Sequence, residues 1–191
     1  MRRDVSRNRA RLLEAARTVV AKQGPEAPLD DIARAAGVSR TTLHRHFPDR
    51  ESLAAAALAS NVAFIEARAY ELAGRADGAE QLFHEVLDLQ IESPWLAHMV
   101  VAGRGEELGN LRARTLTAFE GLMGPAEASH RLQEGVSSQD ALLALPMMMA
   151  VLAVQTEDST SDITRARRML HRGLFLSSPP GQTGAEELGR A

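Results

Sequence analysis

The chain has 191 residues, of which 45% are hydrophobic and 25% charged, and its formal net charge is −3. It contains no cysteine, which excludes disulfide frameworks and cysteine-ligated zinc sites. The N-terminus MRRDVSRNRA lacks the apolar stretch of a secretory signal. The longest apolar run, residues 141–154, is too short to cross a bilayer and is interrupted by Pro146. We therefore expect a cytoplasmic protein without a membrane segment.

The charge is distributed unevenly along the chain. Residues 1–50 carry eleven basic and six acidic side chains, a net charge of +5, whereas residues 51–191 carry eleven basic and nineteen acidic ones, a net charge of −8. A basic segment on an acidic body indicates that the N-terminal part faces a polyanion. The alternative is a chance excess of arginine from GC-rich coding, since the chain has 21 Arg and one Lys. That bias explains the preference for Arg over Lys but not the uneven distribution.

Apolar periodicity predicts helices throughout, and therefore an all-α fold. In the first half the predicted helices cover residues 6–22, 28–36, 39–46 and 50–72. Gly24-Pro25 ends the first helix, Ser39 caps the third, and Pro48-Asp49 precedes the fourth. Further helices are predicted at residues 79–92, 94–102, 106–123, 126–134, 138–155 and 162–176, with Gly124-Pro125 as a break. The tail at residues 177–191 has little to bury, and we expect it to be disordered.

The segment LDDIARAAGVSRTTLHRHF, residues 29–47, has the pattern of a helix-turn-helix. Its apolar residues are spaced to form a small core between two short helices: Ile32, Ala36, Val38, Leu43 and Phe47. Gly37 stands where the chain leaves the first of these helices and needs a positive φ. The second helix would lie in the DNA major groove. The residues predicted to contact DNA are Ser39, Arg40, Thr41, Thr42, His44, Arg45, His46 and Arg50, with Arg7 and Arg11 along the phosphate backbone.

This segment resembles the TetR/AcrR family of bacterial transcriptional regulators. The residues that carry the resemblance are Ile32-Ala33, Ala36-Gly37-Val38-Ser39, Leu43, His46-Phe47 and Arg50-Glu51-Ser52-Leu53. The resemblance implies a three-helix helix-turn-helix DNA-binding domain at residues 1–50, a linking helix at 50–72, and a helical effector-binding and dimerisation domain within 51–176. It further implies a cytoplasmic, nucleoid-associated homodimer on a near-palindromic double-stranded operator: a repressor released by a small apolar effector, without a cofactor.

Three positions depart from the family pattern. His44 stands where the family usually has a tyrosine whose hydroxyl touches a DNA phosphate, and a histidine donates there more strongly when protonated. Ala27-Pro28 replaces a threonine that commonly reaches another phosphate, so we expect that contact to be lost. Arg50 replaces a lysine and serves a phosphate equally well.

The C-terminal half contains candidates for a dimer interface and an effector pocket. Residues 138–155 are apolar nearly all round, which predicts burial on two sides. The predicted interface residues are Leu142, Met149, Leu152, Ile163, Ala166, Leu170 and Leu174. The predicted pocket residues are Phe83, Leu87, Trp95, Met99, Phe119, Met123 and Met147, for each of which plain core packing is the alternative. Polar candidates for the pocket are Gln90, His98 and Arg104.

Other chemistry finds little support in the sequence. His84 and Asp88 lie four residues apart and could form half of a metal site, but a solvated helix face is the better interpretation, and we predict no metal. No phosphate-binding loop, dinucleotide fingerprint or nucleophile elbow is visible, so no residue takes a catalytic role and we predict no enzyme. Two alternatives stay open: a DNA-binding protein without an effector, structural or controlled by a protein partner, and a helical enzyme with a vestigial DNA-binding part.

Overall fold

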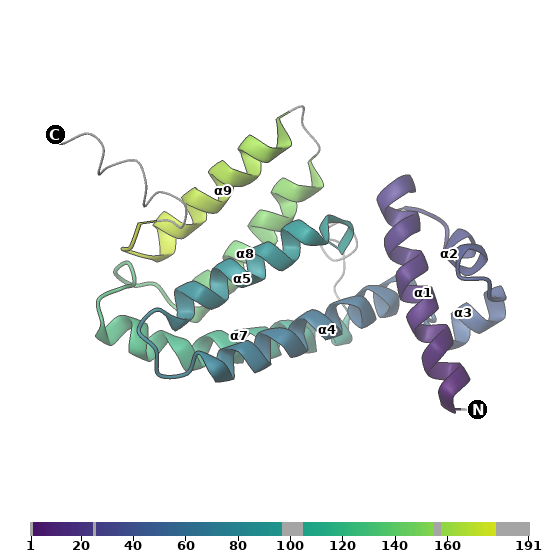
Figure 1. The fold of residues 1–191 in the computed structure, drawn as a ribbon, viewed down its shortest axis with the longest axis horizontal. Helices are drawn as coiled ribbons and strands as arrows, with labels where there is room; N and C mark the ends of the chain where they lie inside the picture. Colours follow the sequence, from purple (N-terminus) through teal and green to yellow (C-terminus); the bar gives the residue numbers. More distant parts are fainter. Residues whose placement is uncertain (1, 25, 97–104, 155–157, 179–191) are drawn as a thin grey trace.

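The computed structural model describes residues 2–24, 26–96, 105–154 and 158–178, and the regular elements in these ranges are helices (Figure 1). In chain order they are α1 (Arg2–Gln23), α2 (Leu29–Ala35), α3 (Arg40–His46), α4 (Arg50–Glu71), α5 (Gly78–Glu92), α7 (Glu106–Ala128), α8 (Ser138–Ala153) and α9 (Ser159–Leu174). An isolated β-bridge joins Leu132 and Phe175. The predicted all-α fold class is confirmed.

Local signals place the ends of the first four helices within a few residues of the predictions. Gly24, with φ of 86°, follows α1 in the left-handed conformation that glycine adopts readily. Asp49 begins α4 with a capping box, because its carboxylate accepts from the Ser52 amide at 2.7 Å and its own amide donates to the Ser52 hydroxyl at 3.3 Å. Residues 97–102 of the helix predicted at 94–102, and residues 179–191 of the predicted tail, lie outside the described residues.

The predicted break at Gly124-Pro125 is wrong. Helix α7 continues through Pro125 to Ala128, and the helix predicted at residues 126–134 does not form. Leu122 and Ala126 lie four residues apart on one face, and both are buried in the core, so their packing outweighs the backbone hydrogen bond that a proline cannot donate. The helix ends at Ala128, and His130, two residues further on, has a φ of 52° that is incompatible with a continuing helix.

The helices form two packed units with separate cores. The first, here called the head, comprises α1, α2, α3 and the first turns of α4, and its fully buried side chains include Leu12, Ile32, Leu43, Phe47 and Leu53. In Figure 1 these helices gather around one end of the long helix α4, which then runs away from them. The predicted division at residues 1–50 and 51–176 remains a prediction, and α4 contributes to the cores on both sides of it.

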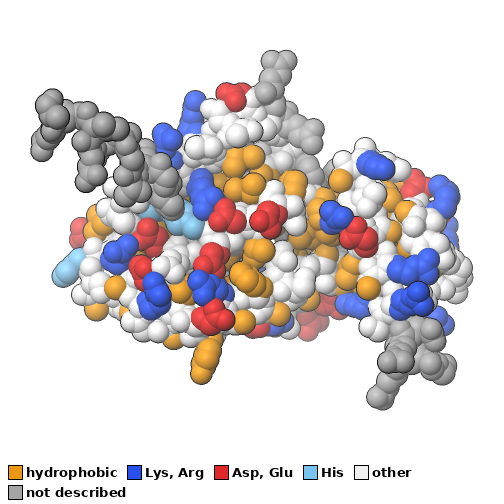
Figure 2. All heavy atoms as spheres, viewed as in Figure 1, with side chains coloured by type: hydrophobic (Ala, Val, Ile, Leu, Met, Phe, Trp, Pro, Cys, Tyr) orange, Lys and Arg blue, Asp and Glu red, His pale blue; other side chains and the backbone are white. Residues whose placement is uncertain are grey.

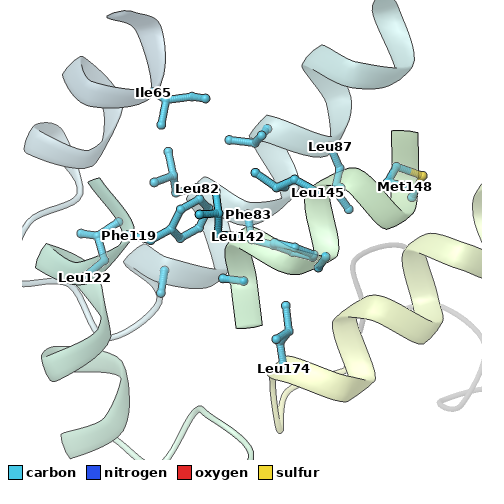
Figure 3. Close-up of a cluster of buried hydrophobic side chains, with 14 of the residues drawn as sticks. Ile65, Leu82, Phe83, Leu87, Phe119, Leu122, Leu142, Leu145, Met148 and Leu174 are labelled. Carbon is cyan, nitrogen blue, oxygen red and sulfur yellow. The ribbon is translucent and has the colours of Figure 1, made fainter. Parts of the chain in front are cut away.

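The second unit, here called the body, comprises the rest of α4 with α5, α7, α8 and α9. Its core is built from large apolar side chains of several helices, among them Phe83, Phe119, Leu122 and Met148, none more than 1% exposed (Figure 3). Full burial of each such side chain contributes roughly 1.5–3 kcal/mol. Among the described residues, no helix combines the length and the apolar character that crossing a membrane requires.

Candidate DNA-binding surface and ligand cavity

The helix-turn-helix is built as its sequence predicts. Ile32 and Leu43 are 0% exposed and Phe47 is 1% exposed, so the two short helices share a closed apolar contact. Gly37 makes the turn with φ of 63°, a conformation that costs glycine little. Ser39 caps α3 by accepting a hydrogen bond from the Thr42 amide at 3.1 Å. These interactions set the angle at which α3 is presented.

Three predicted DNA-contact residues of α3 are exposed: Arg40, Thr41 and Arg45. Arg40 pairs with Asp30 at 2.9 Å, but their side chains are 70% and 45% exposed, and a pair so open to water is readily exchanged for a phosphate. Thr42 is half-buried, and its hydroxyl is 2.9 Å from the Ser39 hydroxyl. Thr42 is thus engaged at the start of the helix, whereas Thr41 and Arg45 have no hydrogen bond or ion pair within the part of the chain that is described.

The two histidines of α3, both predicted to contact DNA, are not equally open to solvent partners. His44 Nδ1 lies 3.3 Å from the Pro48 carbonyl oxygen, which only accepts, so Nδ1 carries the proton of that hydrogen bond. The free Nε2 then donates to a phosphate only when the ring is protonated. His46 is half-buried, because it lies three residues after Leu43 on the inward stripe, and its Nε2 is buried without a partner.

Arg50 has a structural contact that the sequence did not reveal. Its Nη2 donates to the Ala27 carbonyl oxygen at 2.6 Å, and the side chain is half-buried. This bond ties the start of α4 to the segment before α2. Substituting Arg50 would therefore disturb the head as well as any phosphate contact.

Arginines on the first helix extend the basic surface. Arg7 and Arg11 are exposed on α1, and their contact with the DNA backbone stays a prediction. Arg9, on another face of the same helix, has its guanidinium 4.8 Å from the centre of the Phe47 ring, a cation–π contact between α1 and the end of α3. Figure 2 shows basic side chains gathered on the head, at the right of the view.

A cavity of about 470 Å³ lies in the body between α4, α5, α7 and α8, close to the head. Its wall is mostly leucine, valine and isoleucine, with five polar side chains: Asn61, Gln90, Ser93, Arg112 and Thr115. A volume of this size is typical of small-molecule sites. Gln90 was a polar candidate in the sequence; the other two candidates, His98 and Arg104, lie outside the described residues.

The residues predicted to line a pocket do not line this cavity. Phe83, Leu87 and Phe119 are 0% exposed in the solid core of the body, and Met123 packs against that core. Trp95 is packed in the core of the head, Met147 is 52% exposed on the outside of α8, and Met99 lies outside the described residues. Large side chains fill space, and the cavity forms where they are missing. Gly105 and Gly109, four residues apart at the start of α7, were the available signal.

The predicted dimer seam faces the protomer's own core. Leu142, Met149, Leu152 and Leu174 are no more than 8% exposed, and Ile163, Ala166 and Leu170 are half-buried against the same core. The exposed large apolar residues of α8 are Leu143 at 54% and Met147 at 52%, and Val154, directly after the helix, is 63% exposed. Met169 on α9 is 67% exposed. The residues of α8 that were predicted to form the dimer interface are therefore core residues, and the residues next to them in sequence are the exposed ones.

The expected solvated face at His84 is also wrong. His84 is 7% exposed and hydrogen-bonded to His171, and these two residues with Glu80 bring three potential ligand atoms within 4.8 Å of one another. Arg167 Nε donates to His84 Nδ1 at 3.2 Å, because a guanidinium has no lone pair with which to accept. The nitrogen atoms of both imidazoles are engaged in hydrogen bonds. The positive charge of the neighbouring Arg167 guanidinium also repels a metal cation, so the site disfavours one.

Comparisons with known proteins agree with this geometry. Residues 12–57 match the family model described as bacterial regulatory proteins, tetR family. The HTH-type transcriptional repressor LfrR of Mycolicibacterium smegmatis is 39% identical over 87 residues, which is 45% of either chain, so the match spans less than half of that relative. A TetR transcriptional regulator of Streptomyces coelicolor is 28% identical, with a TM-score of 0.55 over 87% of this chain and 98% of the other.

A fold likeness extends to NalD of Pseudomonas aeruginosa, the secondary repressor of the MexAB-OprM multidrug efflux pump, at 20% identity and a TM-score of 0.59 over 91% of this chain and 98% of that one. The helix-turn-helix lies in the segment that matches the model of bacterial regulatory proteins, and the helical body behind it shares its fold with solved TetR regulators. The chain is therefore similar to TetR-family regulators, in sequence over residues 12–57 and in fold over most of its length.

Proposed function

We propose that this protein is a dimeric DNA-binding transcriptional repressor that a small apolar effector releases from its operator. The observation that carries the proposal is the placement of α3. Leu43 and Phe47 are buried beneath it, while Arg40, Thr41 and Arg45 point to solvent. A short helix held from below and polar above is the form in which helix-turn-helix proteins present side chains to base edges.

The two kinds of exposed side chain have different partners on DNA. Thr41 offers a hydroxyl to a base and a methyl group to thymine, and Arg45 can reach guanine or phosphate. Arg7 and Arg11 on α1 contribute phosphate contacts, which position the head without reading sequence. The net charge of +5 on residues 1–50 supports approach to the polyanion.

The outer faces of α8 and α9 support a homodimer. Leu143 and Met147 are exposed on α8, Val154 is exposed directly after its end, and Met169 is exposed on α9. A protein rarely leaves such apolar side chains together in water unless a partner covers them. In a two-fold dimer the same patch from each copy meets its counterpart. Two heads would then read a near-palindromic operator.

Leu96 supports a route from effector to DNA. This residue lines the cavity and also belongs to the apolar core of the head. A ligand that fills the cavity therefore presses on a side chain packed against the DNA-binding unit. Release from DNA requires that the ligand bind more tightly to the DNA-free state than to the DNA-bound state.

The DNA-binding claim is tested with two matched variants. Arg45→Ala removes an exposed cation from α3, and Lys22→Ala removes one from the opposite end of α1 from Arg7. DNA selected by the unmutated protein from a random library serves as the target in a fluorescence-anisotropy titration. We expect Arg45→Ala to weaken binding about tenfold or more and Lys22→Ala to leave it unchanged. Equal effects of the two variants would contradict the assignment of α3 as the reading helix.

A further inference from the structure

The side chains that line the cavity in the described part of the chain carry charge of one sign, while the carboxylate of Glu51, outside the lining, accepts a hydrogen bond from the Gly105 amide. Among the described residues that line it, Arg112 is the only ionisable side chain, and none is a carboxylate. Arg112 is exposed on α7, with no ion pair to an acidic group in the described ranges. Neighbouring arginines of the body are paired instead, as in Arg114 with Glu66 at 2.5 Å and Arg68 with Glu85 at 2.7 Å. The cavity thus ends at an arginine whose charge is available to a ligand.

The polar groups deeper in the wall are neutral. Thr115 is buried and donates its hydroxyl to the Leu111 carbonyl oxygen at 3.0 Å, so it has only lone pairs left to offer. The side-chain oxygen of Gln90 is buried at the wall without a partner. A cation placed among these residues would lose its hydration and find no opposite charge, which is costly in an apolar environment. An anion, in contrast, finds an opposite charge in the guanidinium of Arg112.

We infer that the effector of this cavity is an apolar acid: a hydrocarbon body that fills the leucine-rich wall, with a carboxylate paired to Arg112. The inference rests on the proposed effector function and specifies its ligand class. Cationic amphiphiles of the same size bind least tightly, because the described lining residues offer them no carboxylate. Uncharged amphiphiles bind more weakly than acids, because they share the apolar contacts but not the ion pair.

Three probes with the same alkyl chain test this order: decanoate and decylammonium, each below its critical micelle concentration, and decanol below its solubility limit. Binding to the full chain is measured by isothermal titration calorimetry. We expect decanoate to bind most tightly, decanol about three- to fivefold more weakly, as suits a partly exposed ion pair, and decylammonium at least tenfold more weakly. Decylammonium binding as tightly as decanoate, or no binding by any of the three, would overturn the ligand class.

Two charge-removing variants separate the role of Arg112 from a general charge effect. Arg112→Gln should weaken decanoate about three- to fivefold and leave decanol unchanged. Arg17→Gln removes the same charge from α1, away from the cavity lining, and should change neither. Equal loss for decanoate and decanol in Arg112→Gln would show that Arg112 shapes the cavity and does not pair with an anion, which also contradicts the inference.

Operator binding measured on the same preparations separates this inference from the proposed function. If the protein binds its selected DNA while the order of probe affinities is reversed, the ligand class is wrong and the proposed DNA-binding function is kept. If no DNA sequence is selected, the proposed function fails whatever the probes do.

Discussion

His84 on α5 and His171 on α9 are joined by a hydrogen bond of 2.9 Å inside the body, 87 residues apart in the chain. Because Arg167 donates to His84 Nδ1, the proton of neutral His84 lies on Nε2, which donates to His171 Nδ1. His171 Nε2 in turn donates to the Ser177 carbonyl oxygen at 2.8 Å. The chain of bonds requires both imidazoles to be neutral, and it fastens the end of α9 to α5.

Acid should loosen this junction. Burial, with the positive charge of Arg167 and the neighbouring His171 ring, lowers the pKa of His84 from 6.5 to about 4, against the opposing charges of Glu80 and Asp88. The unfolded chain therefore binds more protons than the folded one between these values. The stabilisation is fully present above pH 6.5 and is lost as the pH falls towards 4, by about 3 kcal/mol from this group alone.

Urea unfolding at a series of pH values checks this, with His84→Gln as the control. Glutamine keeps an amide donor and an acceptor but does not titrate, so its unfolding free energy should be lower near neutral pH and flatter between pH 4.5 and 6.5. Parallel pH curves for the two proteins would show that His84 does not cause the loss.

The exposed apolar residues of α8 should hold the dimer together. Met147→Glu places a charge among them, at a side chain that is 52% exposed in the protomer, and should give a folded monomer. Tyr70→Glu is the control, because Tyr70 is 85% exposed on α4, away from α8 and α9, and should stay dimeric. Light scattering with size-exclusion chromatography measures both masses. A dimeric Met147→Glu variant would place the interface elsewhere.

Substitutions of base-contacting and phosphate-contacting residues should change DNA affinity in different ways. Thr41→Ala should cost about 1–3 kcal/mol on the selected operator and little on random DNA. Arg7→Ala should weaken both DNAs alike and lower the slope of log affinity against log salt by about one unit. Salt titrations of each variant on the operator and on random DNA measure the four affinities and their salt slopes. If Thr41→Ala lost the same affinity for the operator and for random DNA, Thr41 would not be a base-reading residue.

Leu96 should couple the cavity to the head. Leu96→Ala shortens the side chain that serves both, so a ligand such as decanoate should still bind but release DNA less effectively. Leu108→Ala is the matched control, because Leu108 lines the cavity but packs in a different apolar cluster. Ligand-dependent anisotropy of operator DNA measures the release. Normal release by Leu96→Ala would exclude this route.

The head could be predicted from the sequence because its signals are local. Gly37 at the turn, Ser39 at the cap and the spacing of Ile32, Leu43 and Phe47 act within a few residues of one another. The body depends on distant contacts. Periodicity finds two apolar stripes on α8 but cannot say which faces outward, because Leu142 and Leu143 are the same residue type.

The same reason explains the other differences between prediction and structure. The partner of His84 comes from another helix far along the chain, and nothing near His84 reveals it. The cavity is a space left among side chains from four helices, so residue type alone does not identify its wall. Pro125 is a local break signal that the packing of Leu122 and Ala126 overrides.

Footprinting of this chain on the DNA it selects from a random library tests whether two copies of α3 read an inverted repeat. We expect two protected segments of related, inverted sequence, with centres about one helical turn apart or slightly more, one for each α3 of the dimer. Protection of a single unrepeated segment, or binding without any preferred sequence, would contradict it.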